Sequence, residues 1–214
     1  MLKNNLIIFL KYPDPGKVKT RLGKVVGYEK AANIYSILTK YLLTQLSDSN
    51  SYKITVCYTP EDKSVEISNW LNFNYMEPQI GNNLGEILSH AFETSFTNGF
   101  DNTIVIGTDC IEITYNDIEQ AFSYLSENYN SVIGPTNDGG YYLIGLSGRN
   151  YPLIFEDISW GTETVFIKTI EKINMINLNN KVLNYYNDID EISDINSNVI
   201  KIINSYEPNL RILN

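Results

Sequence analysis

The sequence predicts an α/β fold with a mostly parallel sheet that helices cover on both faces. Short apolar segments with the length of buried strands recur along the chain, and segments with apolar residues at helical spacing separate them. This alternation is typical of parallel strands joined by helical crossovers. No linker, internal repeat or change of composition interrupts it, so we expect a single domain over residues 1–214.

The elements follow from local pattern. Residues 6–10 and 103–107 are fully apolar runs of strand length, and residues 29–46 and 84–96 carry one apolar face at helical spacing. Thr114 to Asp117 forms a capping pattern that starts a helix running to Glu127. The remaining expected strands are 53–58, 74–79, 131–134, 141–146 and 182–186, and the remaining helices are 64–71, 162–173 and a terminal one from 191.

Composition excludes several classes of protein. The chain has 16 Lys and Arg against 25 Asp and Glu, a formal net charge of −9, which disfavours binding to nucleic-acid backbones. No segment reaches the length of a membrane span, and Cys57 and Cys110 lack metal-ligand spacing. We expect a soluble cytoplasmic protein with no nucleic-acid or membrane partner. The sequence leaves the oligomeric state, including a homodimer, open.

One short segment opposes the acidic balance of the chain. Residues 11–24 contain one acid, Asp14, and five basic residues: Lys11, Lys17, Lys19, Arg21 and Lys24. Two prolines and a glycine predict a shaped loop rather than a helix for this segment. It follows the apolar strand 6–10, and α/β folds bind phosphates at the carboxyl ends of such strands. The segment therefore predicts a phosphate-binding loop, with a solvated charge patch as the alternative.

Carboxylates follow two other predicted strands. Asp109 comes directly after the strand 103–107, where a carboxylate can bind Mg²⁺. A plain turn or cap is the alternative, but Thr114 to Asp117 already supplies a cap. Asp188 and Asp190 follow the last strand, and neighbouring acids repel each other unless a cation or hydrogen-bond donors neutralise them. Taken alone, this pair is more typical of a solvated turn.

A third segment, residues 135–142, contains Asp138-Gly139-Gly140. Asp-Gly is typical of a hairpin turn, yet two glycines also let the backbone approach a ligand, and Asp138 could accept hydrogen bonds from a sugar hydroxyl. Trp160 and Thr162 combine an aromatic ring with a helix start, which suggests a stacking wall for a substrate, with ordinary packing as the alternative.

Three familiar motifs are excluded. Val18 follows Lys17, where a P-loop requires Ser or Thr. No G-x-G-x-x-G follows a strand, which disfavours a Rossmann dinucleotide site. A Ser-His-Asp triad is disfavoured because the one histidine, His90, lies within a predicted helix with no nucleophile elbow nearby.

Six motifs in this order resemble one family. They are F-x-K-x-P-x-P-G-x-V-K-T-R-L (9–22), Q-x-G-x-x-L-G-E (79–86), I-G-T-D-C (106–110), G-P-x-x-D-G-G-Y-Y-L-I-G (134–145), W-G-T-E (160–163) and D-I-D-x-x-x-D (188–194). The chain resembles the GT-A-like transferases called radical-SAM/selenodomain-associated glycosyltransferase-like proteins. More distantly, it is similar to phospholactate and molybdopterin guanylyltransferases.

The resemblance implies the nucleotide-diphospho-sugar transferase fold, a three-layer α/β/α sandwich with a mostly parallel mixed sheet. It implies a divalent metal, Mg²⁺ or Mn²⁺, on Asp109, Asp188 and Asp190. The expected nucleotide- and phosphate-binding residues are Pro15, Gly16, Lys17, Lys19, Arg21, Gly81 and Gly85. The expected residues for the second substrate are Asp138, Gly139, Gly140 and Tyr141, to which we add Trp160 and Thr162. Ile87 stands where the family commonly has an arginine, which removes one anion contact.

Three functions fit these residues. The preferred one is metal-dependent nucleotidyl transfer from an NTP to a phosphorylated small-molecule acceptor, with Lys19 and Arg21 stabilising the departing pyrophosphate and with Asp109 and Asp138 as further catalytic residues. The second is glycosyl transfer from an NDP-sugar, with Asp138 as the base. The third is a nucleotide-binding module without catalysis. The density of cations favours an intact triphosphate.

Overall fold

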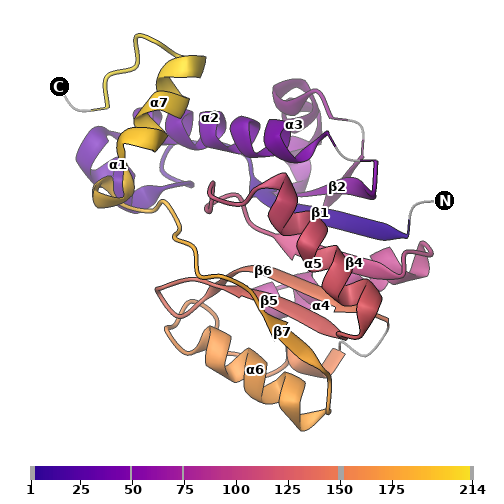
Figure 1. Ribbon diagram of the computed structural model, residues 1–214. Helices are drawn as coiled ribbons and strands as arrows, with labels where there is room; N and C mark the ends of the chain where they lie inside the picture. The colour runs from indigo at the N-terminus through magenta and orange to yellow at the C-terminus, as the bar shows by residue number, and fades with distance from the viewer. Residues whose placement is uncertain (1–2, 49, 74, 149–151, 213–214) are drawn as a thin grey trace.

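Seven strands form one mixed sheet through the middle of the described residues, which are 3–48, 50–73, 75–148 and 152–212 of a computed structural model (Figure 1). The strands are β1 (Asn4–Lys11), β2 (Tyr52–Thr59), β3 (Met76–Pro78), β4 (Asn102–Ile106), β5 (Ser131–Pro135), β6 (Tyr141–Ser147) and β7 (Asn180–Val182). Their order in the sheet is β3-β2-β1-β4-β6-β5-β7. Strand β6 runs antiparallel to β4 and β5, and the other neighbours pair in parallel.

Helices lie on both faces of this sheet. They are α1 (Thr20–Val26), α2 (Tyr28–Leu46), α3 (Ser64–Leu71), α4 (Leu84–Thr97), α5 (Tyr115–Glu127), α6 (Val165–Met175) and α7 (Ser197–Tyr206), with short 3₁₀ turns η1 (Glu61–Lys63), η2 (Pro152–Ile154) and η3 (Ile192–Asp194). Helices α2, α3 and α5 share one core with the sheet, and α4 and α6 share the other. Helices α1 and α7 pack on α2 (Figure 1). The predicted three-layer α/β/α sandwich is confirmed.

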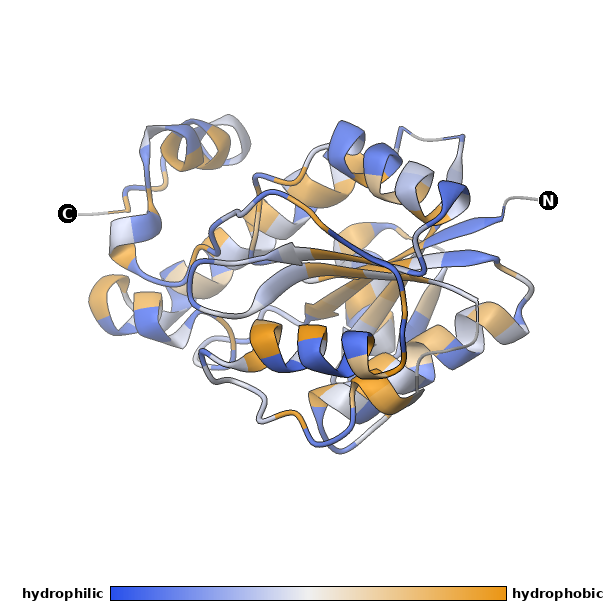
Figure 2. Ribbon diagram, turned by 60° about the horizontal axis from the view of Figure 1, so that its bottom comes forward, coloured by the Kyte–Doolittle hydropathy of each residue, from blue (hydrophilic) through white to orange (hydrophobic). Residues whose placement is uncertain are grey.

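Strand β1 shows how the sequence builds both cores. Leu6, Ile8 and Leu10 belong to the core on the α2 side, whereas Ile7 belongs to the core on the α4 side. Alternate side chains of a strand point to opposite faces, so a strand buried on both faces is apolar throughout. In Figure 2 the strands in the middle of the sheet are largely orange, while the helices carry both blue and orange residues.

Several helices and strands begin or end at other residues than predicted. The loop prediction for residues 11–24 is wrong from Thr20 onward, because the prolines and the glycine that prevent a helix all precede Lys19. Helix α6 begins at Val165 rather than at residue 162. The last strand is β7, shorter and earlier than expected, and Tyr186 makes only an isolated bridge.

The terminal helix also starts later than expected. It begins at Ser197, because the side chain of Asn196 accepts hydrogen bonds from the backbone N–H groups of Asn198 and Val199. The segment from Glu191 forms the short turn η3 instead. The capping box of Thr114 and Asp117 is present as predicted. Within the described ranges, no helix combines the length and the apolar character that crossing a bilayer needs.

Candidate functional site

A cavity of about 680 Å³ lies at the edge of the sheet where the parallel strands β1, β2, β3 and β4 end. Strand β6 runs the other way, so its first residue, Tyr141, reaches the same edge. The wall is formed by the segment after β1, the end of β4, the start of β6 and the first turns of α4. Four of the five clustered basic residues line it, namely Lys11, Lys17, Lys19 and Arg21, and so do Asp109 and Asp190.

The backbone directs Lys19 inward. Lys19 has φ 43° and ψ 47°, a left-handed conformation that is costly for any residue with a Cβ atom. It stands directly before α1, and its carbonyl oxygen accepts the hydrogen bond from the N–H of Gly23 that begins the helix. Only 3% of the Lys19 side chain is exposed. Its ammonium group is therefore held inside the protein rather than in solvent.

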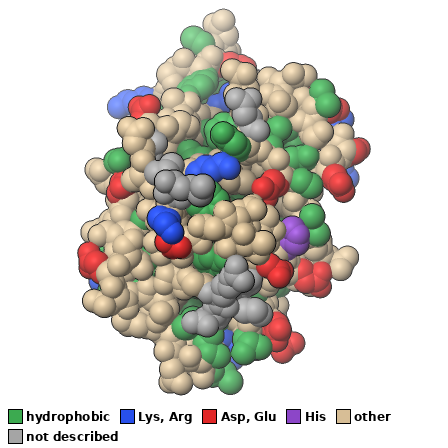
Figure 3. All heavy atoms as spheres, turned by 90° about the vertical axis from the view of Figure 1, so that its right-hand side faces the viewer, with side chains coloured by type: hydrophobic (Ala, Val, Ile, Leu, Met, Phe, Trp, Pro, Cys, Tyr) green, Lys and Arg blue, Asp and Glu red, His purple; other side chains and the backbone are tan. Residues whose placement is uncertain are grey.

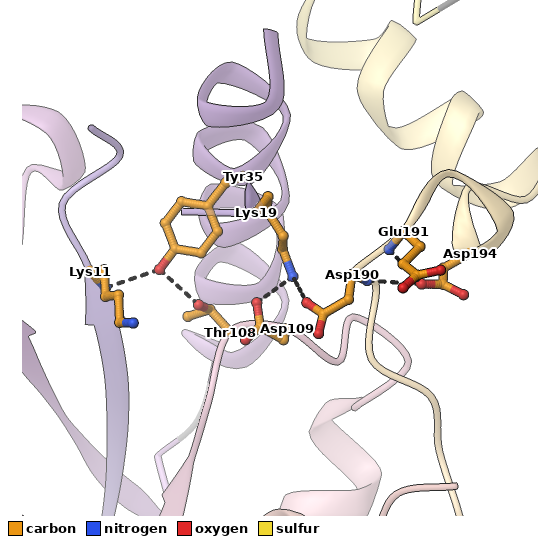
Figure 4. Close-up of polar contacts among 8 residues, drawn as sticks. All are labelled: Lys11, Lys19, Tyr35, Thr108, Asp109, Asp190, Glu191 and Asp194. Carbon is orange, nitrogen blue, oxygen red and sulfur yellow. Dashed lines mark hydrogen bonds and ion pairs between the residues drawn. The ribbon is translucent and has the colours of Figure 1, made fainter. Parts of the chain in front are cut away.

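The ammonium group of Lys19 joins two carboxylates from distant parts of the chain (Figure 4). Its Nζ atom donates a hydrogen bond to Oδ1 of Asp109, at the end of β4. The same atom lies 3.2 Å from Oδ1 of Asp190, in the segment after β7. Each aspartate side chain remains 49% exposed, so the carboxylates face both the lysine and the solvent.

This pair of carboxylates fits a divalent cation. Asp109 and Asp190 both approach one positive charge, and the Lys19 ammonium stands in for the ion. Mg²⁺ is commonly held by one or two carboxylates together with phosphates and water. Among the residues that the structure describes, no group of three or more His, Cys, Asp or Glu side chains forms a metal site. Further ligands would therefore come from a bound phosphate and water.

Asp188, the third predicted metal ligand, is part of the same acidic surroundings but does not line the cavity. Burial, together with the negative charges of Asp109, Asp138 and Asp190, raises its pKa to about 7. Lys19 opposes this shift only in part. Only Asp109 and Asp190 contact the Lys19 ammonium directly, so Asp188 lies among negative charges with no cation of its own in the described part of the chain.

The remaining cations of the segment are accessible to a ligand. Arg21 is 68% exposed and lies 3.6 Å from Glu191, and Lys17 is exposed without an ion pair in the part of the chain that the structure describes. Figure 3 shows the opposite edge of the sheet, where basic and acidic side chains are scattered and mixed. Four of the five basic residues of the segment line the cavity, so the cluster of charge in the sequence is also a cluster in space. Lys24 is not among the lining residues.

Tyr35 is one of the lining residues that were not predicted as site residues. Tyr35 on α2 is 5% exposed, and its hydroxyl accepts hydrogen bonds from the backbone N–H of Lys11 and from the hydroxyl of Thr108 (Figure 4). It ties the end of β1 to the end of β4. In the sequence, Tyr35 is one of several residues on the apolar face of a predicted helix. Only its phenol oxygen, which needs a hydrogen-bond partner when buried, indicates a further role.

Gln79 is another lining residue that was not predicted. Its Nε2 atom donates to the carbonyl oxygens of Leu10 and Cys57, at 3.3 and 3.0 Å. Two acceptors fix the orientation of the amide, because a flipped amide would place its oxygen against both carbonyls. Gln79 belongs to a motif that the resemblance rests on, but its contacts depend on strands that only the fold brings together.

The turn after β5 has a structural explanation of its own. Oδ1 of Asp138 accepts hydrogen bonds from the hydroxyl of Thr136 and the N–H of Gly140. Gly139 has φ 87°, and a Cβ atom there would lie 2.0 Å from the carbonyl oxygen of Glu163. Both features belong to the hairpin and to its contact with the start of α6.

Of the other predicted site residues, some line the cavity and others make contacts within the fold. Tyr141 lines the cavity, and the ring of Trp160 packs against it edge to face at 6.4 Å. The hydroxyl of Thr162 donates to the carbonyl of Ser159. A Cβ atom on Gly85 would lie 2.6 Å from the carbonyl oxygen of Phe155. The predicted site residues outside the cavity lining are Pro15, Gly16, Gly81, Gly85, Asp138, Gly139, Gly140, Trp160, Thr162 and Asp188.

Comparisons with known proteins identify the family of the chain and structures similar to it. Residues 42–162 match the family described as "Uncharacterized protein conserved in bacteria (DUF2064)". A crystal structure from Desulfovibrio desulfuricans G20, of a protein provisionally named a nucleotide-diphospho-sugar transferase, is 31% identical, with a TM-score of 0.86 over 99% of this chain and 98% of that one. None of the curated proteins matches the sequence.

More distant structures share the fold. A cytidylyltransferase from Leptospira borgpetersenii serovar Hardjo-bovis (strain JB197) is 16% identical, with a TM-score of 0.62 over 100% of this chain and 97% of that one. The inositol-1-phosphate CTP transferase from T. maritima is 13% identical, with a TM-score of 0.57 over 98% of both chains. The chain therefore belongs to the DUF2064 family, and its fold is the GT-A-like fold that the resemblance implied.

Proposed function

We propose that this protein is a transferase that requires Mg²⁺ or Mn²⁺ and moves a nucleotidyl group from a nucleoside triphosphate to a phosphorylated small molecule. One observation carries the proposal: Asp109 and Asp190 meet around a single cation in the same cavity that the basic residues Lys17 and Arg21 line. Phosphoryl chemistry needs mainly positioned cations, and this cavity offers side-chain cations together with carboxylates for a metal.

The related proteins support a nucleotide substrate. The provisional name of the Desulfovibrio protein is nucleotide-diphospho-sugar transferase, and the Leptospira and T. maritima proteins are named a cytidylyltransferase and a CTP transferase. All of these names describe enzymes whose substrates are nucleotides or nucleotide-sugars. The acceptor and the nucleobase are not carried over from them.

In the proposed reaction, an oxygen of the acceptor phosphate attacks the α-phosphorus of the triphosphate in line with the departing group. The bond from the α-phosphorus to the bridging oxygen breaks, and the products are a nucleoside diphosphate conjugate and pyrophosphate. Arg21 can hold two phosphate oxygens at once and Lys17 adds a second charge, so both would stabilise the pyrophosphate as it leaves. Asp109 and Asp190 would hold the divalent ion, which supplies neutralising charge to the phosphates when bound.

The apolar part of the wall would orient the nucleotide. Leu84, Ile87 and Tyr141 line the cavity beside the polar groups. An apolar wall excludes water, and electrostatic contacts to phosphate strengthen where water is excluded. Water would otherwise compete with the acceptor for the α-phosphorus.

A thermal-shift screen tests the proposal with the purified protein. The ligands are NTPs, NDPs and NDP-sugars, each with EDTA or with Mg²⁺. A ligand at 100 times its dissociation constant adds about 2.7 kcal/mol to stability, so the melting temperature should rise by roughly 5–10 °C with an NTP and Mg²⁺. Asp109→Asn should abolish the shift.

Asp101→Asn is the matched control. Asp101 lies just before β4, at the opposite end of the strand from Asp109, and pairs with Lys3 on the surface at 2.8 Å. It loses the same charge without touching the cavity, so it should keep the full ligand shift. A metal-dependent shift with NDP-sugars and none with NTPs would instead favour glycosyl transfer. No shift with any nucleotide would overturn the proposal.

A further inference from the structure

Lys17 and Lys19 lie two residues apart in the same basic segment but in different environments. Lys17 is exposed, whereas the side chain of Lys19 is 3% exposed and its ammonium lies between Asp109 and Asp190 (Figure 4). The sequence alone makes the two lysines equivalent candidates for phosphate ligands. Of the two, however, only Lys17 is free to meet an anion in this structure.

Lys19 lies in contact with both carboxylates. Its Nζ atom donates to Oδ1 of Asp109 and of Asp190, and a lysine ammonium carries a positive charge at neutral pH. The group is therefore a resident cation. A neutral amine would leave the two carboxylates repelling each other.

A metal ion would need the same oxygens. The Lys19 ammonium contacts Oδ1 of both aspartates, and these carboxylates are the ones that fit a divalent ion. Two cations at one pair of oxygens repel each other strongly, because the interaction is only partly screened beside buried groups. Lys19 and a metal therefore compete for one position.

We propose that Lys19 is the built-in counter-ion of Asp109 and Asp190 and that it leaves them when a divalent metal binds. The lysine side chain has four rotatable methylene units, and both carboxylates are half exposed toward the cavity, so the exchange needs no unfolding of α1. As far as the metal and the nucleotide are concerned, this inference rests on the proposed function.

The exchange makes metal and nucleotide binding cooperative. Without a nucleotide, the displaced ammonium has no anion to meet and the metal must compete with it. With a triphosphate in the cavity, the ammonium gains phosphate oxygens as new partners, so the metal should bind more tightly. By linkage, the metal must strengthen nucleotide binding by the same factor.

Titration of Mn²⁺, with the free ion followed by electron paramagnetic resonance, tests the exchange without nucleotide and without turnover. The variants are Lys19→Met and its matched control Lys17→Met, which removes the same charge from the same loop without touching the carboxylates. We expect Lys19→Met to bind Mn²⁺ about tenfold more tightly than Lys17→Met, because only the first variant removes the competing cation. Circular dichroism and thermal melting establish that both variants fold.

A second measurement uses the wild-type chain and so does not depend on whether the Lys19 variant folds. Brief acetylation with acetic anhydride, read by mass spectrometry, reports how accessible each amine is. Labelling of Lys19 should be low in EDTA and rise severalfold at saturating Mn²⁺, while labelling of the exposed Lys17 stays constant. Lys19 labelling that does not change at saturating Mn²⁺ would overturn the inference.

The outcomes separate this inference from the proposed function. If both variants bind Mn²⁺ equally and nucleotide binding still depends on metal, the counter-ion exchange is wrong and the proposed function stands. If the wild type and the variants all fail to bind Mn²⁺, with and without a triphosphate, the metal dependence fails and the exchange fails with it.

Discussion

At the scale of single residues, the structure divides roles that the sequence assigns together. Lys17, Lys19 and Arg21 all follow from one basic motif as phosphate ligands. The burial of Lys19 depends on its left-handed backbone and on carboxylates 90 and 171 residues further along the chain. No local pattern reports such contacts, so the sequence could predict the cluster of charges but not which lysine is paired.

Arg21 provides a test of phosphate recognition. Replacing it by lysine keeps the charge but removes the planar fork that binds two oxygens together. Affinity for an NTP with Mg²⁺, measured by calorimetry, should fall about tenfold in Arg21→Lys. Lys24→Arg, on the same helix but outside the cavity lining, is the control and should change nothing. Equal affinities of Arg21→Lys and wild type would argue against a bidentate contact.

Asp188 predicts a dependence of stability on pH. Burial raises its pKa to about 7 in the folded protein, above its ordinary value of 3.8. Between these two values the folded state holds the proton more tightly than the unfolded state, so the stabilisation is complete below about pH 4 and is lost as the pH rises through 7.

Urea unfolding in EDTA measures this effect. Asp188→Asn keeps the side chain neutral, so it should match the wild type near pH 4.5 and exceed it at pH 8 by about 2 kcal/mol, a figure reduced for partial exposure. Asp62→Asn removes a charge from an exposed position in η1 and should show no such pH-dependent difference. A difference of the same size at both pH values would contradict the assignment.

At the scale of elements, the sequence predicts which helices and strands exist better than it predicts the residues at which they begin and end. The apolar runs and helical periodicity identify the elements that form the two cores, because burial dictates those patterns. Helix α1 and the late start of α7 are missed, since a single cap such as Asn196 or a strained residue such as Lys19 decides them. The Asp-Gly-Gly sequence at residues 138–140 is compatible with both a tight hairpin and a ligand-binding loop, so the sequence does not decide between them.

Gly139 tests how tightly that turn is packed. Its φ of 87° and the carbonyl oxygen of Glu163, 2.0 Å from an added Cβ atom, both exclude a side chain. Gly139→Ala should therefore lose at least ~3 kcal/mol of unfolding free energy, from backbone strain and from displacement of the start of α6.

Gly161 is the matched comparison. Its φ is 77°, but nothing lies within 4 Å of an added Cβ atom. Gly161→Ala should cost only about 1 kcal/mol, the strain of the left-handed conformation. Chemical denaturation of both variants measures the difference. Similar losses in both would mean that the contact with Glu163 gives way easily.

At the scale of the whole molecule, topology creates the site. Alternating strands and helices predict a parallel sheet, but no local signal indicates that β6 inserts between β4 and β5. This insertion brings Tyr141 to the edge where the parallel strands end. The return of the chain after β7 brings Asp190 to the end of β4, where the backbone N–H of Ile189 donates to the carbonyl of Asp109. Both residues reach the cavity through contacts between segments that are far apart in the sequence, so no local pattern predicts their positions.

The proposed function requires that Asp109 and Asp190 hold a divalent ion against a bound triphosphate. A crystal grown with Mn²⁺ and a non-hydrolysable NTP, measured at the manganese absorption edge, shows whether they do. We expect one anomalous peak about 2.2 Å from an oxygen of each aspartate and from a phosphate oxygen, with the Lys19 ammonium moved to the triphosphate. A bound triphosphate without a manganese peak at these carboxylates, with Lys19 still between them, would contradict it.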